Sequence, residues 1–200
     1  MTDVAGPSLA AQLRTTRSES MVSEVEAVAL ELFDARGFDH VTVDEIATAA
    51  RISARPFYRY FATNEDLLQV QIDRRNAAVS AALARVPSGE TPLGSLRVAL
   101  TEVIAAEDPE LRRRWVAVVA SNPSVTNAVL GGIVLKSHRT FADYLATRLG
   151  EPSDALLPAM LAGAVGGLVQ AATTNWLVNG GDLAATVAAG LRVLERGIGS

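Results

Sequence analysis

Apolar residues recur at helical spacing along nearly the whole chain, so the sequence predicts an all-α protein. A first helix is expected over about 21–36, because its apolar side chains share one face (Val22, Val25, Ala29, Leu32 and Phe33). Gly37 stands where a helix usually stops. The polar residues 1–19 are predicted to form a flexible tail, and they are too polar for a signal peptide.

Three more helices are predicted between residues 42 and about 80. Thr42-Val43-Asp44-Glu45 has the form of a capping box, which should begin a helix of about two turns. A third short helix is expected to begin near Ser53, and Thr63-Asn64-Glu65-Asp66 offers a cap for a long fourth helix. Four helices therefore fall within about sixty residues.

Turn-forming residues divide the rest of the chain into five further helices, so about nine are expected in all (the breaks are 87–89, 108–109, 121–123, 150–152 and 179–181). The last two, over about 153–178 and 182–197, are rich in Ala, Gly, Leu and Val. They would leave a large apolar surface in a monomer, which favours a homodimer with a paired four-helix interface. Its close crossing is predicted at Gly163, Gly166 and Gly167.

Composition narrows the possible classes of protein. The 200 residues are 49% hydrophobic and carry a formal net charge of −4, which fits one or two domains with a sizeable core. The chain has no cysteine, which excludes disulfides, thiolate metal sites and cysteine nucleophiles, and makes the cytoplasm the expected compartment.

Residues 155–181 contain no charged side chain, and Gly163-x-x-x-Gly167 matches a pairing pattern of membrane helices. Polar residues and Pro158 interrupt this segment, and its flanks are the acidic Asp154 and Asp182. We therefore expect a helix buried on several sides of the protein, and no membrane partner.

The segment Ile52–Phe61, ISARPFYRYF, has no acidic residue and combines arginines with aromatic residues. At 100° per residue, Phe57 and Phe61 share one helix face, while Arg55 and Arg59 lie about 200° away from them. The rings should point inward and the guanidinium groups outward. A short helix of this kind after a capped helix is the helix-turn-helix arrangement, in which arginine binds bases or phosphates of double-stranded DNA. The simpler interpretation is a solvated helix face.

The run from Glu26 to Leu68 resembles the DNA-binding domain of TetR-type transcriptional regulators at many positions (Ala29, Leu32, Phe33, Gly37, Phe38, Thr42, Val43, Ile46, Ala47, Ala50, Ile52, Ser53, Tyr58 and Phe61). The resemblance implies a homodimer with a three-helix DNA-binding domain over 20–66, its helix-turn-helix over about 42–61, and a ligand-binding and dimerisation domain over 67–200. It also implies that Thr42, Ser53, Tyr58 and Tyr60 contact the DNA backbone, and that Ala54 and Arg55 face bases.

Three residues depart from that family pattern. Arg51 stands at a turn position that often holds glycine, so a left-handed conformation would be strained, and the sequence leaves open whether the turn keeps its usual form. Asn64 replaces a common phosphate-binding lysine, and Pro56 replaces a frequent threonine. These changes affect the expected affinity for the operator, although Arg51 and Asn64 remain candidate DNA-contacting residues.

The carboxy-terminal half is expected to hold a small hydrophobic or amphipathic ligand in a pocket lined by its bulky side chains (Trp115, Val119, Phe141, Tyr144, Met160 and Trp176). Each of these residues also fits an ordinary core position. Residues 111–125, LRRRWVAVVASNPSV, loosely resemble a subgroup with an acyl-CoA-like ligand. Three successive arginines spread over about 200° of a helix, so at least two of Arg112, Arg113 and Arg114 are expected in solvent or in ion pairs.

These patterns predict a ligand-responsive DNA-binding regulator, by family expectation a repressor. The alternative is a helical dimer that carries a hydrophobic ligand without regulating genes. Catalysis is disfavoured, because the only histidines are His40 and His138 and no metal-spaced cluster, phosphate loop or nucleophile elbow occurs. We therefore expect no cofactor and no metal.

Overall fold

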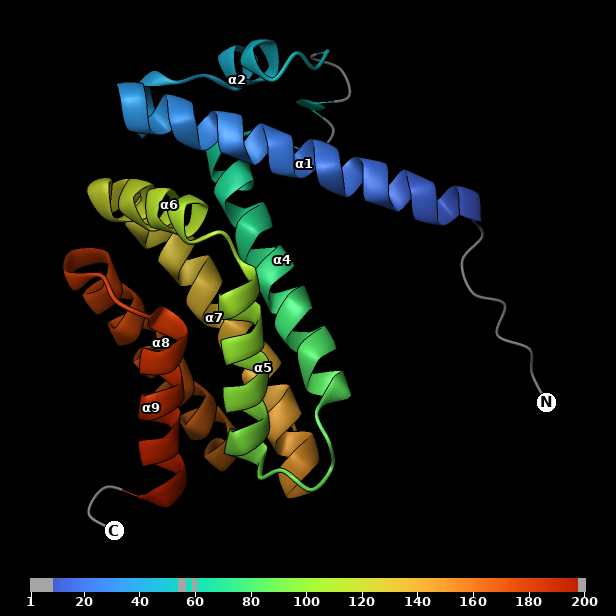
Figure 1. Ribbon diagram of the computed structural model, residues 1–200, viewed down its shortest axis with the longest axis vertical. Coiled ribbons are helices and arrows are strands. Elements are labelled where there is room, and N and C mark those ends of the chain that lie inside the picture. Colours follow the sequence, from blue (N-terminus) through green and yellow to red (C-terminus); the bar gives the residue numbers. More distant parts are fainter. Residues whose placement is uncertain (1–8, 54–56, 59–60, 198–200) are drawn as a thin grey trace. The chain divides into compact units, whose positions relative to one another are not determined.

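The computed structural model describes residues 9–53, 57–58 and 61–197 of the chain, with side chains left out at 9–20, 124 and 127–135 (Figure 1). These residues form eight α-helices and one short 3-10 helix, and no strand, which confirms the all-α prediction. The chain divides into two compact units, Met1–Leu67 and Leu68–Ser200. The remaining predicted helix falls on Ser53–Phe61, of which only residues 53, 57, 58 and 61 are described.

The first unit contains α1 (Leu9–Arg36), η1 (Phe38–His40), α2 (Val43–Ala49) and the first turn of α4 (Asn64–Arg85). Helix α1 begins twelve residues before its predicted start, so the predicted tail is helical from Leu9 onwards. The reason is that residues 9–20 contain no glycine or proline and several strong helix formers.

Local chemistry sets the helix ends of this unit. Gly37 adopts φ 83°, which is open to glycine, and its N–H donates to the Phe33 carbonyl at 2.8 Å, so α1 ends there. At the start of α4 the Asp66 N–H donates to Thr63 Oγ1 at 3.2 Å, and the Thr63 N–H donates to Asp66 Oδ2 at 2.9 Å. The predicted cap of the long helix is thereby confirmed.

The second unit contains the rest of α4 and the five further predicted helices, α5 (Pro92–Ala106), α6 (Pro109–Ser121), α7 (Pro123–Leu149), α8 (Leu156–Asn179) and α9 (Leu183–Arg196). Each of α5, α6 and α7 has proline as its first residue, where the missing N–H costs no intrahelical bond. Helix α5 packs on α9, and α7 packs on α8. Buried side chains from these helices form one core (Leu96, Leu145, Val165, Val187 and Leu191 among them).

Helix α8 is much more exposed than expected. Among the described residues it is the one helix long and apolar enough to cross a membrane, yet only 22% of its most apolar window is buried within the chain. The prediction that it is buried on several sides was therefore wrong for a single chain. The physical reason is that α6, α7 and α9 pack on α8 while its buried residues share one face, which leaves large apolar side chains of α8 in solvent (Leu156, Leu157, Met160 and Val178).

Candidate DNA-binding surface and ligand cavity

A complete capping box fixes the start of α2. Thr42 Oγ1 accepts from the Glu45 N–H at 3.3 Å, while Glu45 Oε2 accepts from the Thr42 N–H at 2.8 Å. Arg36 Nη2 donates to the other carboxylate oxygen of Glu45 at 2.8 Å. The Thr42 backbone hydrogen bond, followed by the Arg36 and Thr42 side chains, lowers the pKa of Glu45 to about 2. Because the folded pKa lies below the ordinary 4.5, the stability that this carboxylate adds is present above pH 4.5 and is lost as the pH falls toward 2.

The turn after α2 is left-handed despite its arginine. Arg51 has φ 55° and is the only residue other than glycine with positive φ in the described part of the chain. The Ile52 N–H donates to the Ala47 carbonyl at 3.0 Å, and the Arg51 N–H donates to the Thr48 carbonyl at 3.1 Å. These two bonds form a Schellman motif, in which glycine is the usual residue at the position of Arg51. The question that the sequence left open is thereby answered: the turn keeps its usual form, and these two hydrogen bonds hold the arginine in the strained region.

We expect Arg51→Gly to stabilise the first unit by about 1 kcal/mol, because glycine adopts this conformation without the steric cost that other residues bear. Urea denaturation with far-UV circular dichroism would measure the change. The matched control is Arg51→Ala, which removes the guanidinium and keeps the positive-φ strain, so its stability should stay near that of the wild type. An Arg51→Gly variant less stable than Arg51→Ala would contradict this account of the turn.

The segment Ile52–Phe61 is called the recognition segment from here on, and its two phenylalanines lie as predicted. Phe57 and Phe61 are 0% and 1% exposed, and their ring centroids are 5.2 Å apart. The Phe61 N–H donates to the Phe57 carbonyl at 3.0 Å, and the Phe57 N–H donates to the Ser53 carbonyl at 3.4 Å, as in a helix. The prediction that these rings point inward is confirmed. Four of the nine predicted DNA-contacting residues lie outside the described residues, as does Pro56 (Ala54, Arg55, Arg59 and Tyr60).

Two predicted DNA-contacting side chains have partners within the first unit. Tyr58 is 46% exposed, and its hydroxyl donates to Asp44 Oδ1 at 2.7 Å, which raises the pKa of Tyr58. Asn64 Nδ2 donates to the Val41 carbonyl at 2.6 Å, so this side chain links the start of α4 to the residue before the capping box. Their roles at DNA, and those of Thr42, Arg51 and Ser53, stay predictions.

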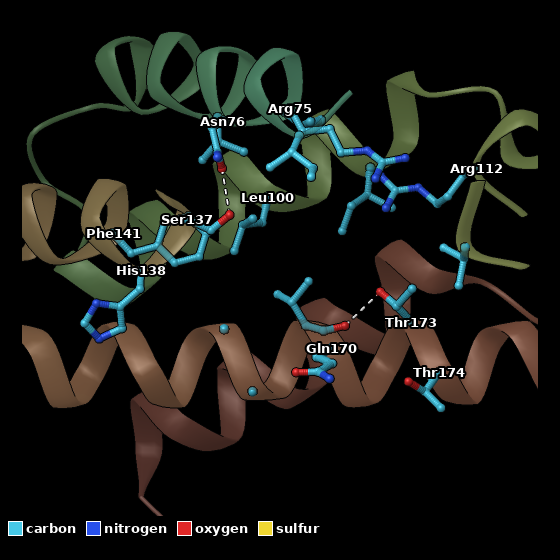
Figure 2. A pocket seen from close by; sticks show the side chains of 18 of the residues that line it. Arg75, Asn76, Leu100, Arg112, Ser137, His138, Phe141, Gln170, Thr173 and Thr174 are labelled. Atoms are coloured by element: carbon cyan, nitrogen blue, oxygen red, sulfur yellow. Dashed lines mark hydrogen bonds between the residues drawn. The ribbon is translucent and has the colours of Figure 1, made fainter. Parts of the chain in front are cut away.

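The second unit contains a cavity of about 480 Å³ lined by residues of α4 to α8. Figure 2 shows side chains of α4 facing those of α8 across this space. Of the six predicted pocket residues, Trp115, Val119 and Phe141 line it. Its other walls come from smaller apolar side chains, among them Val79, Leu100 and Val103.

The other three residues predicted for the pocket are not among those that line this cavity (Tyr144, Met160 and Trp176). The Tyr144 hydroxyl accepts from Arg148 Nη1 at 2.8 Å, and Met160 is 63% exposed. Trp176 belongs to the core and lies under the Arg113 guanidinium, whose carbon is 4.7 Å from the ring centroid. The prediction relied on side-chain size, which does not show which face of a helix turns to the cavity.

A cluster of charges forms one end of the cavity. Glu107 accepts from Arg75 Nε at 3.0 Å and lies 2.7 Å from Arg112 Nη2, so two guanidinium groups share one carboxylate. The Arg75 guanidinium also lies 4.7 Å above the Trp115 ring. Arg112 is only 8% exposed, and burial, followed by the nearby charge of Arg75, lowers the pKa of Arg112 to about 10. It is therefore still a cation at neutral pH.

Arg113 and Arg114 are not among the described lining residues. Arg114 Nε pairs with Glu110 Oε1 at 3.3 Å on the same helix, and Arg113 covers Trp176. The prediction that at least two of the three arginines point elsewhere or form ion pairs is confirmed. Arg112 also forms an ion pair, with Glu107, and both residues line the cavity.

Sequence reasoning missed the polar residues of the lining. Asn76 and Ser137 face each other, with Ser137 Oγ donating to Asn76 Oδ1 at 2.9 Å (Figure 2). His138 Nε2 lies 2.8 Å from the Ala159 carbonyl. Gly163, Gly166 and Gly167, predicted at a dimer crossing, also line the cavity. A single chain does not test the dimer prediction. The sequence does not distinguish these polar cavity residues from residues on a solvent-exposed helix face, because both recur at the same helical spacing.

Comparison with known proteins assigns the chain to a family. The profile of bacterial regulatory proteins of the tetR family matches residues 27–70, and that of the MftR C-terminal domain matches residues 90–199, more than half of the chain. The chain is 39% identical over 108 residues to the HTH-type transcriptional regulator TcmR of Streptomyces glaucescens, a match over 53% of this chain and 46% of TcmR. It is 26% identical to the putative mycofactocin biosynthesis transcriptional regulator MftR of Mycobacterium tuberculosis, over 80% of this chain and 82% of that protein.

Solved structures have the same fold. A TetR-family regulator from Syntrophomonas wolfei superposes with a TM-score of 0.69 at 15% identity, covering 90% of this chain and 97% of that one. Thermus thermophilus FadR, in complex with lauroyl-CoA, superposes with a TM-score of 0.59 at 23% identity, covering 88% and 94%. Together with the capped helix-turn-helix, these matches mean that the chain belongs to the TetR family of bacterial transcriptional regulators, with a DNA-binding amino-terminal domain and a carboxy-terminal domain of the MftR type.

Proposed function

We propose that this regulator is a repressor that binds operator DNA as a homodimer and is released by a small hydrophobic or amphipathic molecule. The supporting observation is the orientation of the recognition segment. Phe57 and Phe61 are buried while Tyr58 between them is exposed. The spacing of the sequence predicts that Arg55 and Arg59 lie on the helix face opposite the two rings and are available to DNA.

The proposed DNA contacts divide into two groups. Thr42, Ser53, Tyr58 and Tyr60 would bind phosphates, with Arg51, Arg59 and Asn64 beside them, and Ala54 and Arg55 would face bases in the major groove. The Tyr58 hydroxyl now donates to Asp44, and a phosphate oxygen would replace that acceptor on binding.

The dimer proposal is supported by apolar surface that a single chain leaves exposed. Leu156, Met160 and Val178 of α8 and Val193 of α9 are all more than half exposed. Burying such surface against a second copy stabilises a dimer, and the helix pair α8 and α9 would become the four-helix interface. A dimer would also explain the exposed apolar surface of α8 without a membrane. The acidic flanks Asp154 and Asp182 disfavour a membrane span, and a dimer of this kind fits a protein of the cytoplasm.

Helix α4 supplies a physical route for release. Its first turn carries Asn64, which bonds to Val41 beside the capping box, and three turns later it carries Arg75 and Asn76 of the cavity lining. A ligand that binds better when α4 is shifted would favour a state in which the two recognition helices are no longer one DNA turn apart, about 34–36 Å. The neighbour that holds lauroyl-CoA supports an amphipathic ligand, and acyl-CoA-like molecules are one candidate.

Replacing Arg55 and Arg59 together by alanine tests DNA recognition. Each arginine that binds a base or a phosphate contributes about 1–3 kcal/mol, so removing both should lower operator affinity at least about thirtyfold. Fluorescence anisotropy would measure it, on DNA fragments selected by the wild-type protein from its own genome. Arg139→Ala, an exposed arginine of α7, is the matched control and should leave the affinity unchanged. If the double variant binds DNA as tightly as the wild type, the ligand-carrier alternative is favoured instead.

A further inference from the structure

Three buried N–H donors of the second unit lack a hydrogen-bond partner, and all three belong to residues that line the cavity. They are Arg112 Nε, Trp115 Nε1 and Asn76 Nδ2, the only such buried side-chain atoms among the described residues of this unit. An unpaired buried donor costs about 1–3 kcal/mol. Because every one of the three is a donor, the missing partner is an acceptor, and the natural place for it is the cavity.

The charges of the lining point to an acceptor that is negative. Arg75 and Arg112 are both bonded to Glu107, the one acidic residue in the described lining, so the cluster has two cations and one anion. Arg112 bonds to that carboxylate through Nη2, which leaves Nε free to donate elsewhere. Burial makes the uncompensated positive charge costly, and a ligand with a single negative charge would offset it.

The rest of the cavity is suited to an apolar body. Val79, Leu100, Val103, Phe141 and Val169 line it, and the glycines of α8 leave space beside them. In Figure 2 the two arginines lie together at one end, and Asn76, Ser137 and His138 lie farther along. The cavity therefore has a cationic end and a mainly apolar length with a few polar groups.

Resting on the ligand-responsive role proposed above, we propose that the effector is an amphipathic monocarboxylate. Its carboxylate accepts hydrogen bonds from Arg112 Nε and Trp115 Nε1, its apolar body lies along the valine, leucine and phenylalanine wall, and an oxygen acceptor on that body pairs with Asn76 Nδ2. The two guanidinium groups then share two carboxylates, that of Glu107 and that of the ligand.

A free acid fits this site better than its coenzyme A thioester. Coenzyme A carries several phosphate charges that need cationic partners, and a thioester has no carboxylate for the charged end. The two other arginines of the triple run are engaged elsewhere, Arg113 over Trp176 and Arg114 with Glu110. A cavity of about 480 Å³ is also of the size that holds a drug-sized molecule.

Isothermal titration of the full-length protein with matched probes tests the proposal. The probes are dodecanoate, dodecan-1-ol and dodecanoyl-CoA, which share one chain and differ in the head group, and 2-naphthoate as an aromatic acid. Dodecanoate should bind, at least tenfold tighter than the alcohol and tighter than the thioester, and 2-naphthoate shows whether an aromatic acid is also accepted. A charged acceptor gains more from these donors than a neutral one.

Variants identify the donors. Arg112→Gln keeps a hydrogen-bonding group for Glu107 and removes the charge, so the preference for dodecanoate over the alcohol should fall to about twofold or less. Trp115→Phe keeps a ring under Arg75 and removes only the N–H, so dodecanoate should bind about three- to tenfold more weakly. Arg114→Gln is the control outside the cavity and should keep the full preference. Should Arg112→Gln fail to fold, Trp115→Phe and the wild-type probe series still decide the matter.

The outcomes separate this inference from the proposed function. Equal binding of acid and alcohol, tighter binding of the thioester, or no carboxylate binding below about 1 mM would overturn the monocarboxylate proposal. Operator affinity is measured in parallel by anisotropy. A carboxylate that binds as described and leaves operator affinity unchanged would support the chemistry of the cavity and contradict only the release mechanism.

Discussion

Phe57→Ala is expected to destabilise the first unit by about 3–5 kcal/mol, the usual cost of replacing a buried phenylalanine by alanine. Phe57 is fully buried, and its ring packs on that of Phe61 with centroids 5.2 Å apart. A folded domain is typically stable by only about 5–15 kcal/mol, and a unit of this size is near the lower end. The recognition segment should therefore lose its anchor, and operator binding should be lost with it.

Chemical denaturation followed by circular dichroism would measure the stability, and fluorescence anisotropy the operator affinity. The matched control is Tyr58→Phe, the neighbouring aromatic residue with its exposed hydroxyl. It keeps the ring and removes an exposed hydrogen bond to Asp44, so its stability should stay close to that of the wild type. A Phe57→Ala variant that loses less than about 1 kcal/mol would show that this ring does not hold the recognition segment in place.

Glu107→Gln is expected to destabilise the second unit by about 3 kcal/mol, the lower end of the cost of removing one partner from a buried ion pair. The carboxylate accepts from Arg75 and pairs with Arg112, and without it two guanidinium groups face each other with no anion between them. The partial exposure of Glu107 places the cost at that lower end. Thermal unfolding monitored by circular dichroism would measure the loss.

The comparison with Glu110→Gln makes this prediction specific. Glu110 forms an exposed pair with Arg114 on one helix, so its loss should cost no more than about 0.5 kcal/mol. The double variant Glu107→Gln/Arg112→Gln should be more stable than Glu107→Gln alone, because it removes a cation that the single variant leaves unpaired. Equal stability of the single and double variants would contradict the coupling of these charges.

Much of the fold was accessible from the sequence because its signals are local. The capping box at Thr42 and the cap before α4 act within four residues of chain and have the predicted place. Helices α6 and α7 begin at Pro109 and Pro123, which belong to the predicted breaks at 108–109 and 121–123. The inward rings of the recognition segment also follow from spacing along one helix. Burial of α8 was misjudged, because composition does not tell a face covered by another helix from one left open to a second chain.

The cavity shows why the candidate site was harder to predict. Arg75 and Glu107 are 32 residues apart in the chain and meet through packing of different helices. Bulky side chains were the sequence criterion for the pocket, and three of six lie elsewhere. The donors that define the chemistry of the lining include Asn76, a residue with no sequence signal, since an asparagine on a solvated helix face has the same pattern.

Local chemistry along the chain is thus enough to specify helical structure, the capped helix-turn-helix and the inward side of the recognition segment, because hydrogen bonds and apolar contacts between residues three or four apart decide them. Tertiary structure alone decided which side chains surround the cavity and which N–H groups are left there without a partner. Those outcomes depend on how helices distant in sequence pack together, and the energy of a buried charge or an unpaired donor depends on what surrounds it in space.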